Sequence, residues 1–415
     1  MRWPSTTIGQ LCLPTEQRDP TASPEKPFRY IDISAIDKDA KRITSAPELL
    51  GAEAPSRARK AVRAGDVLVS TVRPNLNAVA VVPDELDGEI ASTGFCVLRA
   101  NPELAEGKFI FYRCLTPEFV NSLVAQMRGA NYPAVSDGVV KRAETPLPAP
   151  KEQRRIVELL EQADGLRRQR TEADTLADRI LPALFLKMFG DPATNPKGWA
   201  TTTLDQTTEI TTGNTPSRED PENFGGEIPW ARPADLEIAL PLLHTAENIS
   251  EKGGLVARIV PAGSVLVCCI GATLGKVGLA GVEMAINQQI NALLPSAKAT
   301  PEFLYTFCLL NARNFMAAAT QATLPILNKS RFGQQPVFLP PIERQCRFSE
   351  LAQAVMKQRA SQSQARVRLE NIFGTMLHRA FTGELTAKWR EAHLKELLAE
   401  MEQQARVLRE KPVER

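Results

Sequence analysis

The residues that could support catalysis are few, and their spacing fits none of the reactions they suggest. Gly271–Gly278 (GATLGKVG) is similar to a phosphate-binding loop, but three residues rather than four separate its first two glycines. Val277 stands where such a loop places the Ser or Thr that binds magnesium. We therefore interpret these glycines as residues that let strands turn and pack. No GxGxxG motif follows an expected strand, so a dinucleotide or methyl-donor loop is not indicated.

Other candidate centres are also incomplete. Asp84 and the pair Glu106 and Lys108 have the spacing of a metal-dependent nuclease core, but they stand in PDELDGE and PELAEGK, which are typical of surface turns. No GxSxG or other nucleophile signature occurs. The histidines are isolated and show no metal-ligand spacing: His244, His378 and His393. The sequence therefore predicts a non-catalytic chain with no metal site and no cofactor of its own.

Cysteine usage and the absence of targeting signals favour a cytoplasmic protein. The seven cysteines form an odd count without a CxxC motif, and most have apolar neighbours, which is typical of reduced core thiols. They are Cys12, Cys96, Cys114, Cys268, Cys269, Cys308 and Cys346. The chain does not begin with an apolar signal segment. It also lacks an apolar stretch of the roughly 18 residues that a membrane span requires.

Length and charge set further limits. The chain has 415 residues with 43% hydrophobic and 24% charged side chains, which indicates a globular protein of two or three domains. A net charge of +2 excludes a basic coat over the whole surface. Residues 1–148 hold 18 basic and 18 acidic side chains, and residues 192–338 hold 10 and 12. Attraction of nucleic acid by charge alone is therefore expected to be weak.

An internal repeat organises the chain. Leu147–Asp191 (LPAPKEQRRIVELL…) and Leu339–Glu384 (LPPIERQCRFSELA…) superpose after a shift of 192 residues, which places Gln153 on Gln345. Each is preceded by a similar globular segment. Similar segments recur in the same order in both globular parts, among them β-branched runs expected to be strands, the starts of buried helices and short segments that contain proline. These pairs are Val62–Val82 with Val260–Ala280, Glu89–Ala100 with Glu283–Leu294, Lys108–Leu115 with Glu302–Leu309, and Ala130–Val135 with Ala322–Leu327.

The repeat predicts an α+β fold in which two α/β-type globular domains are separated by two long antiparallel coiled-coil helices with pseudo-twofold symmetry. The expected boundaries are 1–148 and 192–338 for the globular domains, 149–191 and 339–384 for the helical regions, and 385–415 for a helical tail. Each helix of about 40 residues would be ~60 Å long. Pro182 is expected to bend or restart the first helix.

Both helices show a heptad stripe of apolar and small residues. The stripe comprises Ile156, Leu159, Ala163, Leu166, Ala173, Ala177, Ile180 and Leu184 in the first helix, and Phe348, Leu351, Val355, Ala365, Leu369, Ile372 and Met376 in the second. Arg170, Gln358 and Gln362 interrupt it. If the helices are antiparallel, Arg170 lies near Gln362 in a layer that either fixes the register or is a solvated defect. In the tail, a stripe of Trp389, Leu394, Leu397, Leu398 and Met401 indicates docking on the same chain or on a partner.

The order of these features resembles the specificity subunit of type I restriction-modification enzymes, over about Trp3–Arg390. Thr211–Leu236 and Phe28–Asp37 look like the openings of two target recognition domains. LPAPKEQRRI and Ala380–Glu391 (AFTGELTAKWRE) resemble the helical regions of that family. Arg344 departs from the pattern because it replaces an acid, which affects one local contact.

This resemblance implies a DNA-recognition subunit without catalytic residues. Each globular domain would read one half of an asymmetric, interrupted DNA target, and the helices would set the spacer between the halves. Two methyltransferase (M) subunits would bind the helices and methylate flipped adenines with S-adenosylmethionine. Motor-nuclease (R) subunits would bring the requirement for ATP and Mg²⁺. The partners implied are therefore double-stranded DNA and these subunits, and no membrane.

The candidate DNA-binding residues are polar side chains at loop-like positions, because Arg pairs with guanine and Asn or Gln with adenine. In the first half they are Arg57, Arg59, Lys60, Arg63, Arg73, Asn75, Asn77, Asn131 and Tyr132. In the second half they are Thr212, Asn214, Thr215, Ser217, Arg218, Asn287, Gln288, Gln289, Asn328, Lys329 and Arg331. The strand-like run Asn287–Gln289 is the best single cluster, although a structural amide network would also explain it.

Two other functions stay open at this point. A stand-alone modification enzyme with an unrecognised active site would bind a methyl donor by itself. A coiled-coil scaffold that binds protein through its globular ends would leave no DNA footprint. The pair of divergent domains favours the two-reader interpretation over both.

Overall fold

A computed structural model describes residues 3–129, 132–236, 241–320 and 324–410. The chain divides into two compact units, one formed by Met1–Arg168 with Arg368–Arg415 and the other by Gln169–Val367. Within the described residues, no helix combines the length and the apolar character needed to cross a membrane.

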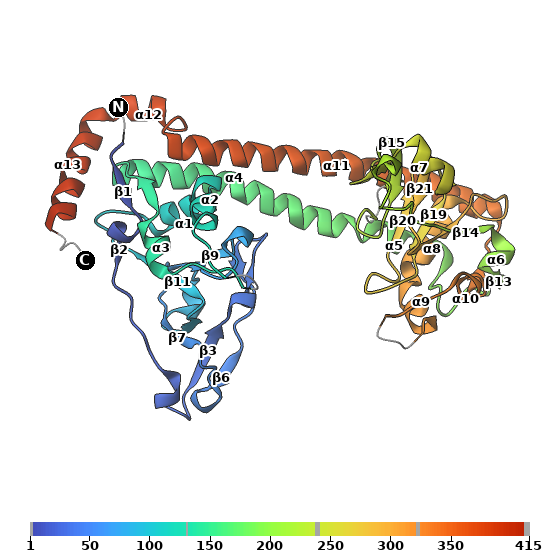
Figure 1. The fold of residues 1–415 in the computed structure, drawn as a ribbon, viewed down its shortest axis with the longest axis horizontal. Coiled ribbons are helices and arrows are strands. Elements are labelled where there is room, and N and C mark those ends of the chain that lie inside the picture. Colours follow the sequence, from blue (N-terminus) through green and yellow to red (C-terminus); the bar gives the residue numbers. More distant parts are fainter. Residues whose placement is uncertain (1–2, 130–131, 237–240, 321–323, 411–415) are drawn as a thin grey trace. The chain divides into compact units, whose positions relative to one another are not determined.

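The first unit contains two four-stranded sheets (Figure 1). The first has the order β6-β3-β10-β7, with β3 parallel to β10, and consists of Glu48–Leu50, Pro27–Ile31, Ile90–Ser92 and Ala58–Ala61. The second, β2-β11-β8-β9, is antiparallel and consists of Cys12–Leu13, Phe95–Ala100, Val67–Ser70 and Val79–Val81. Two-stranded pairs join β1 (Ser5–Thr7) to β12 (Glu144–Pro146) and β4 (Ile36–Asp37) to β5 (Arg42–Ile43).

Helices complete the first unit. They are α1 (Gly107–Leu115), α2 (Pro117–Val124) and α3 (Asp137–Arg142), followed by the first part of α4 (Pro150–Ala177) and the last part of α11 (Ile342–Thr382). Phe109 of α1, Leu160 of α4 and Leu377 of α11 share one buried cluster with strand residues of the second sheet. The helical region is therefore part of the domain core.

The second unit repeats this topology. One sheet has the order β17-β15-β21-β18, and the other has the order β14-β22-β19-β20 with β16 added at its edge. Their bounds are Asn248–Ile249, Phe224–Ala231, Met284–Ile286 and Arg258–Val260, then Ile210–Thr212, Ile290–Leu293, Val265–Cys268, Val277–Ala280 and Pro241–Leu242. β13 (Thr201–Thr203) pairs with β23 (Pro336–Phe338). The helices are α6 (Leu204–Thr207), α7 (Glu251–Val256), α8 (Pro301–Leu310), α9 (Ala312–Ala318) and α10 (Lys329–Gly333).

The two glutamines that the repeat superposes occupy equivalent sites. The Gln153 side chain donates to the carbonyls of Leu104 and Pro148 and accepts the N–H of Glu106 at 3.0 Å. Gln345 donates likewise to the carbonyls of Lys298 and Pro340, and it accepts the N–H of Thr300 at 3.1 Å. Both glutamines are fully buried. Each satisfies backbone groups of the loop before a buried helix, which explains why both repeats keep this residue.

The first long helix is shorter than the sequence predicts. α4 ends at Ala177, and a second helix, α5, runs over Ile180–Phe189. Pro182 lies in the first turn of α5, where its missing N–H breaks no helical hydrogen bond. The restart associated with Pro182 is therefore confirmed. Of the two helical regions, the second forms one continuous helix of the predicted length, α11 with 41 residues.

The predicted heptad stripe is displaced from the buried faces. Leu166 and Ile180 of the stripe are 56% and 50% exposed, and Ile372 is 54% exposed. Ile156, Ala177 and Phe348 of the stripe are buried as predicted. Elsewhere the buried residues lie one position later, as Leu160 shows in α4 and Leu377 in α11. The cause is that these helices pack against the domain cores as well as along a seam. In the second unit, for example, Phe185 of α5 stacks on Phe303 of α8 at 5.3 Å.

A polar network interrupts the helices in the second unit. Asp174 is buried and pairs with Arg170 at 2.8 Å and with Arg359 at 3.0 Å. Arg359 also donates to Gln362 at 3.3 Å and pairs with Asp178 at 2.6 Å. Arg170 and Gln362 are thus linked through Asp174 and Arg359. The interruption is a hydrogen-bonded network, which does not fit a solvated defect.

The tail docks on the first unit of its own chain, beside the N-terminal strand β1 (Figure 1). It consists of α12 (Ala387–Ala392) and α13 (Leu394–Glu410). The predicted stripe is only partly correct, because Leu397 is buried whereas Leu394 and Leu398 are 41% and 45% exposed. Gln404 lies on the buried face with Leu397.

Candidate DNA interface

The turn between β8 and β9 has an unusual backbone. Arg73 and Asn77 both adopt left-handed conformations, with φ of +48° and +47°. The turn is pinned to the loop that follows α2, because the Arg73 N–H donates to the Pro133 carbonyl at 2.7 Å. The guanidinium of Arg73 lies 5.4 Å from the ring of Tyr132, which is 73% exposed. A cation and an aromatic ring are thereby presented together at the surface.

The second unit builds the same turn with other residues. Gly271 and Gly275 stand at the positions equivalent to Arg73 and Asn77, with φ of +85° and +87°. The Gly271 N–H donates to the Pro325 carbonyl at 2.9 Å, as Arg73 does to Pro133. Leu324 takes the place of Tyr132 and is 53% exposed. The interpretation of these glycines as turn residues is confirmed, and the two units share one frame with different side chains.

The other basic candidates of the first unit are mostly engaged. Lys60 forms an ion pair with Asp137, and its side chain is 13% exposed. Arg59 contacts Asp19 at 3.4 Å, and Arg63 contacts Glu16 at 3.0 Å while remaining 60% exposed. The exposed candidates are Arg57, Arg63, Arg73, Asn75 and Tyr132, whereas Asn77 is half-buried and Asn131 lies outside the described residues. The turn with Arg73 and Tyr132 is therefore the best-formed candidate in this unit.

The cluster Asn287–Gln289 forms a turn between β21 and β22, so the expectation of a strand is wrong. Asn287 is 7% exposed and accepts the N–H of Gln289 at 2.7 Å, which is a structural role. Gln288 is exposed and bonded to the hydroxyl of Thr215. The half-buried Gln289 donates to the Ile270 carbonyl at 3.5 Å. Gln288 and Thr215 are thus the accessible polar pair.

The remaining candidates of the second unit divide in the same way. Asn214 is used internally, since it donates to the Val256 carbonyl at 2.6 Å and accepts the N–H of Arg258 at 2.7 Å. Arg218 pairs with Glu247 at 2.9 Å and lies 4.8 Å from the Phe224 ring. Thr212 donates to Asn291 at 2.6 Å, Asn328 caps α10 by accepting the N–H of Arg331 at 2.9 Å, and Ser217, Lys329 and Arg331 are exposed.

Two residues near the Arg73 turn were not among the sequence candidates. Arg128 is exposed, and its N–H and carbonyl bond to Ala134 in the loop that carries Tyr132. Its place just before that segment would have identified it. The Lys41 ammonium donates to the Asn77 carbonyl, and burial lowers the pKa of Lys41 to about 8. Lys41 lies more than 30 residues from the turn in sequence, so spacing alone could not have found it.

The described residues also bear on the metal sites and reactive cysteines that were considered from the sequence. No group of three His, Cys, Asp or Glu residues suited to a metal ion occurs in the described part of the chain. Six of the seven cysteines are buried and Cys346 is exposed, so the expectation that most cysteines lie in the core is confirmed. Burial raises the pKa of Cys96 and of Cys269 to about 12, which makes both thiols poor nucleophiles at neutral pH.

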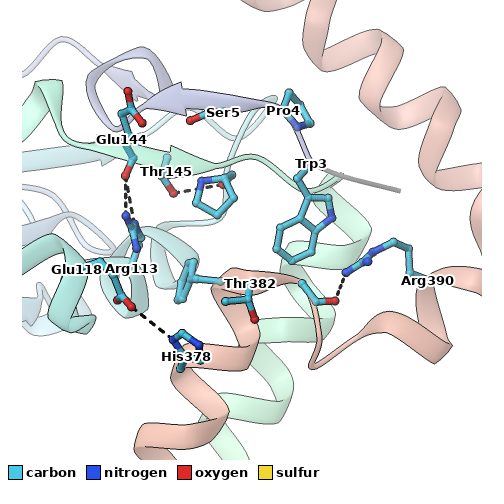
Figure 2. Close-up of a pocket in the computed structure, with 13 residues that line it drawn as sticks. Trp3, Pro4, Ser5, Arg113, Glu118, Glu144, Thr145, His378, Thr382 and Arg390 are labelled. Carbon is cyan, nitrogen blue, oxygen red and sulfur yellow. Dashed lines mark hydrogen bonds and ion pairs between the residues drawn. The ribbon is translucent and has the colours of Figure 1, made fainter.

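A hollow of the first unit lies elsewhere (Figure 2). It has a volume of about 660 Å³ and is lined by residues of β1, α1, α11 and α12, including Trp3, Arg113, His378 and Arg390. His378 pairs there with Glu118 at 3.4 Å, and Arg113 donates to the Glu144 carbonyl at 2.8 Å. None of the candidate DNA-binding residues lines it. The hollow marks where the two ends of the chain meet in this unit.

Comparisons with known proteins agree with this architecture. The profile of the type I restriction modification DNA specificity domain matches residues 196–370. The HindI specificity subunit of Haemophilus influenzae is 23% identical over 80% of this chain and 89% of its own. The MjaIX specificity subunit of Methanocaldococcus jannaschii is 22% identical over 87% of this chain and 97% of its own.

A solved structure adds a more similar relative. One chain of a type I R-M system, studied for complex assembly and conformational transition, is 32% identical, with a TM-score of 0.57. The match covers 92% of the present chain and 98% of that chain. The second unit thus contains the specificity-domain fold, and the first unit repeats its sheet topology. The chain belongs to the type I restriction-modification specificity subunits.

Proposed function

We propose that this chain is the DNA-recognition subunit of a type I restriction-modification complex and that each unit reads one half of an asymmetric, interrupted target. The observation that carries the proposal is the shared turn frame. Arg73 and Gly271 occupy equivalent left-handed positions, and each is tied by its N–H to a proline carbonyl of the neighbouring loop. A fixed frame with variable side chains suits two readers of one duplex that recognise different bases.

The exposed side chains suggest different chemistry for the two halves. In the first unit, Arg73 is suited to a bidentate contact with guanine, and Tyr132 to stacking or an apolar contact. In the second unit, Gln288 is suited to adenine, with Thr215 holding its amide. Phosphate contacts would come from exposed Arg57, Arg128 and Lys329. These contacts would position the duplex without reading its sequence.

The helical regions would separate and orient the readers. We take the boundaries as 1–148 and 192–338 for the recognition domains, with two antiparallel helical regions between them, related by pseudo-twofold symmetry. The helices would dock two methyltransferase (M) subunits, and R subunits would join the full complex. S-adenosylmethionine, ATP and Mg²⁺ would bind those partners. This chain would contribute specificity and no catalytic group.

The decisive experiment is a methylome by single-molecule sequencing. Host DNA is compared with and without this chain, with the methyltransferase partner present in both. An interrupted methyladenine motif that disappears on deletion is the expected result. A motif that persists would contradict the proposal and support the coiled-coil scaffold. A continuous motif would mean that only one unit reads DNA.

A further inference from the structure

Charged residues at the start of α4 hold the tail on the first unit. Glu152 is 1% exposed and accepts hydrogen bonds from the Thr386 hydroxyl at 2.6 Å and from Arg390 Nε at 2.7 Å. Its second oxygen accepts the indole N–H of Trp3 at 2.9 Å. The neighbouring Lys151 pairs with Glu396, and its backbone N–H donates to Glu400 at 2.8 Å. One acid and one base thus each meet an opposite charge from the tail.

Further contacts fix the position of the tail. The guanidinium of Arg390 lies 4.6 Å from the Trp3 ring and donates to the Gly383 carbonyl at 2.6 Å (Figure 2). Gln404 Nε2 donates to the Leu104 carbonyl at 2.9 Å, the same carbonyl that Gln153 uses. Leu397 is fully buried. The tail therefore covers the face around Gln153 with both polar and apolar contacts.

The second repeat keeps the frame of this face and inverts its charges. Glu343 stands at the position of Lys151, and Arg344 at that of Glu152. Both are exposed. The Arg344 guanidinium lies 5.5 Å from the ring of Trp199, and the Arg390 guanidinium lies 4.6 Å from the ring of Trp3. Gln345 still binds the carbonyls of Lys298 and Pro340. The two faces therefore share a buried glutamine and an arginine–tryptophan contact, and they differ in charge.

We propose that the sign of the charge at these two consecutive positions makes the face of the first repeat a docking site for the C-terminal helices and makes the face of the second repeat unable to hold such helices. On the second face, Arg390 would meet Arg344, and Glu396 with Glu400 would meet Glu343. Like charges at a contact oppose association, and a buried charge without a partner is strongly unfavourable. Arg344, the residue that departs from the family pattern, thereby acquires a function as the excluding charge.

The test replaces the two charged residues of the first repeat by the residues that the second repeat has at these positions. In the full chain, Lys151→Glu with Glu152→Arg should release the tail. Hydrogen–deuterium exchange over residues 394–410 should become about a hundredfold faster or more, as expected for loss of a buried ion pair. Trypsin cleavage after Lys395 should accelerate in parallel. Glu158→Lys is the matched control, because Glu158 pairs with Arg155 on the same helix and its exchange pattern should match that of the wild type.

A compensating variant separates charge from simple misfolding. Adding Arg390→Glu, Glu396→Lys and Glu400→Lys to the inverted pair should restore protection of α13, with β8 protected throughout. A tail that stays protected in the inverted pair would overturn the proposal. So would a tail that the compensating charges fail to restore, because packing and not charge would then decide where it docks.

Discussion

Arg73 holds a backbone conformation that glycine adopts without cost, and the second unit places Gly271 at the same position. Arg73→Gly therefore removes the proposed reading side chain and relieves strain of about 1–2 kcal/mol. We expect the melting temperature to be unchanged or higher. Discrimination at one base pair of the first half-site should fall by about 1–3 kcal/mol. Competition binding of the methyltransferase complex to a duplex library measures this loss.

Arg29→Ala is the control for that variant, because Arg29 is an exposed arginine of the same unit that is not among the candidate DNA-binding residues. It should leave base discrimination unaltered. If Arg73→Gly keeps full discrimination while the wild-type complex reads two half-sites, Arg73 is not a reader, although the recognition function stands.

The buried glutamines allow a comparison between the two units. Gln345→Ala leaves the Thr300 N–H and the carbonyls of Lys298 and Pro340 without this partner. Gln153→Ala should cost less stability, because Gln404 still donates hydrogen bonds to the carbonyls of Leu104 and Pro148. At about 1–3 kcal/mol for each unsatisfied buried group, Gln345→Ala should destabilise more than Gln153→Ala. Urea unfolding of both variants tests the order, and equal losses would refute it.

Lys41 gives the first unit a defined pH dependence. Burial lowers its pKa to about 8 from an ordinary value of 10.5. Between these values the unfolded chain binds more protons than the folded chain, so stability rises with pH over that window. Lys41→Met should remove this contribution, whereas the exposed Lys38→Met should not. Urea midpoints at pH 7.5 and 10 provide the measurement, and an unchanged slope in Lys41→Met would contradict the assignment.

At the scale of elements, the repeat in the sequence predicted the paired sheets and the buried helices, because β-branched runs and apolar helix starts recur in the same order. The helical face was predicted less well. Leu159 and Leu160 are adjacent and equally apolar, so periodicity cannot decide which faces the core. The packing of α4 against α1 decides in favour of Leu160. Asn214 and Lys60 are engaged by Val256 and Asp137, which lie far away in the sequence. The sequence pattern therefore could not predict these contacts either.

The network around Asp174 should stabilise the helical region of the second unit unequally. Arg359→Leu leaves the buried Asp174 with Arg170 alone and removes the partner of Asp178. We expect a loss of about 3 kcal/mol or more, typical of a broken buried pair. Arg170→Leu should cost less, because Asp174 keeps Arg359. Thermal melting and size-exclusion chromatography of both variants test this, and slipped or oligomeric species should be more abundant for Arg359→Leu.

At the scale of the whole molecule, two units of one topology with different exposed turns should act as independent readers. Gln288→Ala should weaken discrimination only in one half of the target, and Arg73→Gly only in the other. Because the two residues lie in separate units, the losses should add within about 0.5 kcal/mol in the double variant. Binding of the wild type, the two single variants and the double variant to duplexes altered in either half completes this double-mutant cycle. Strong coupling between the two losses, or a change in both half-sites from one substitution, would mean that the units read the duplex as a single surface.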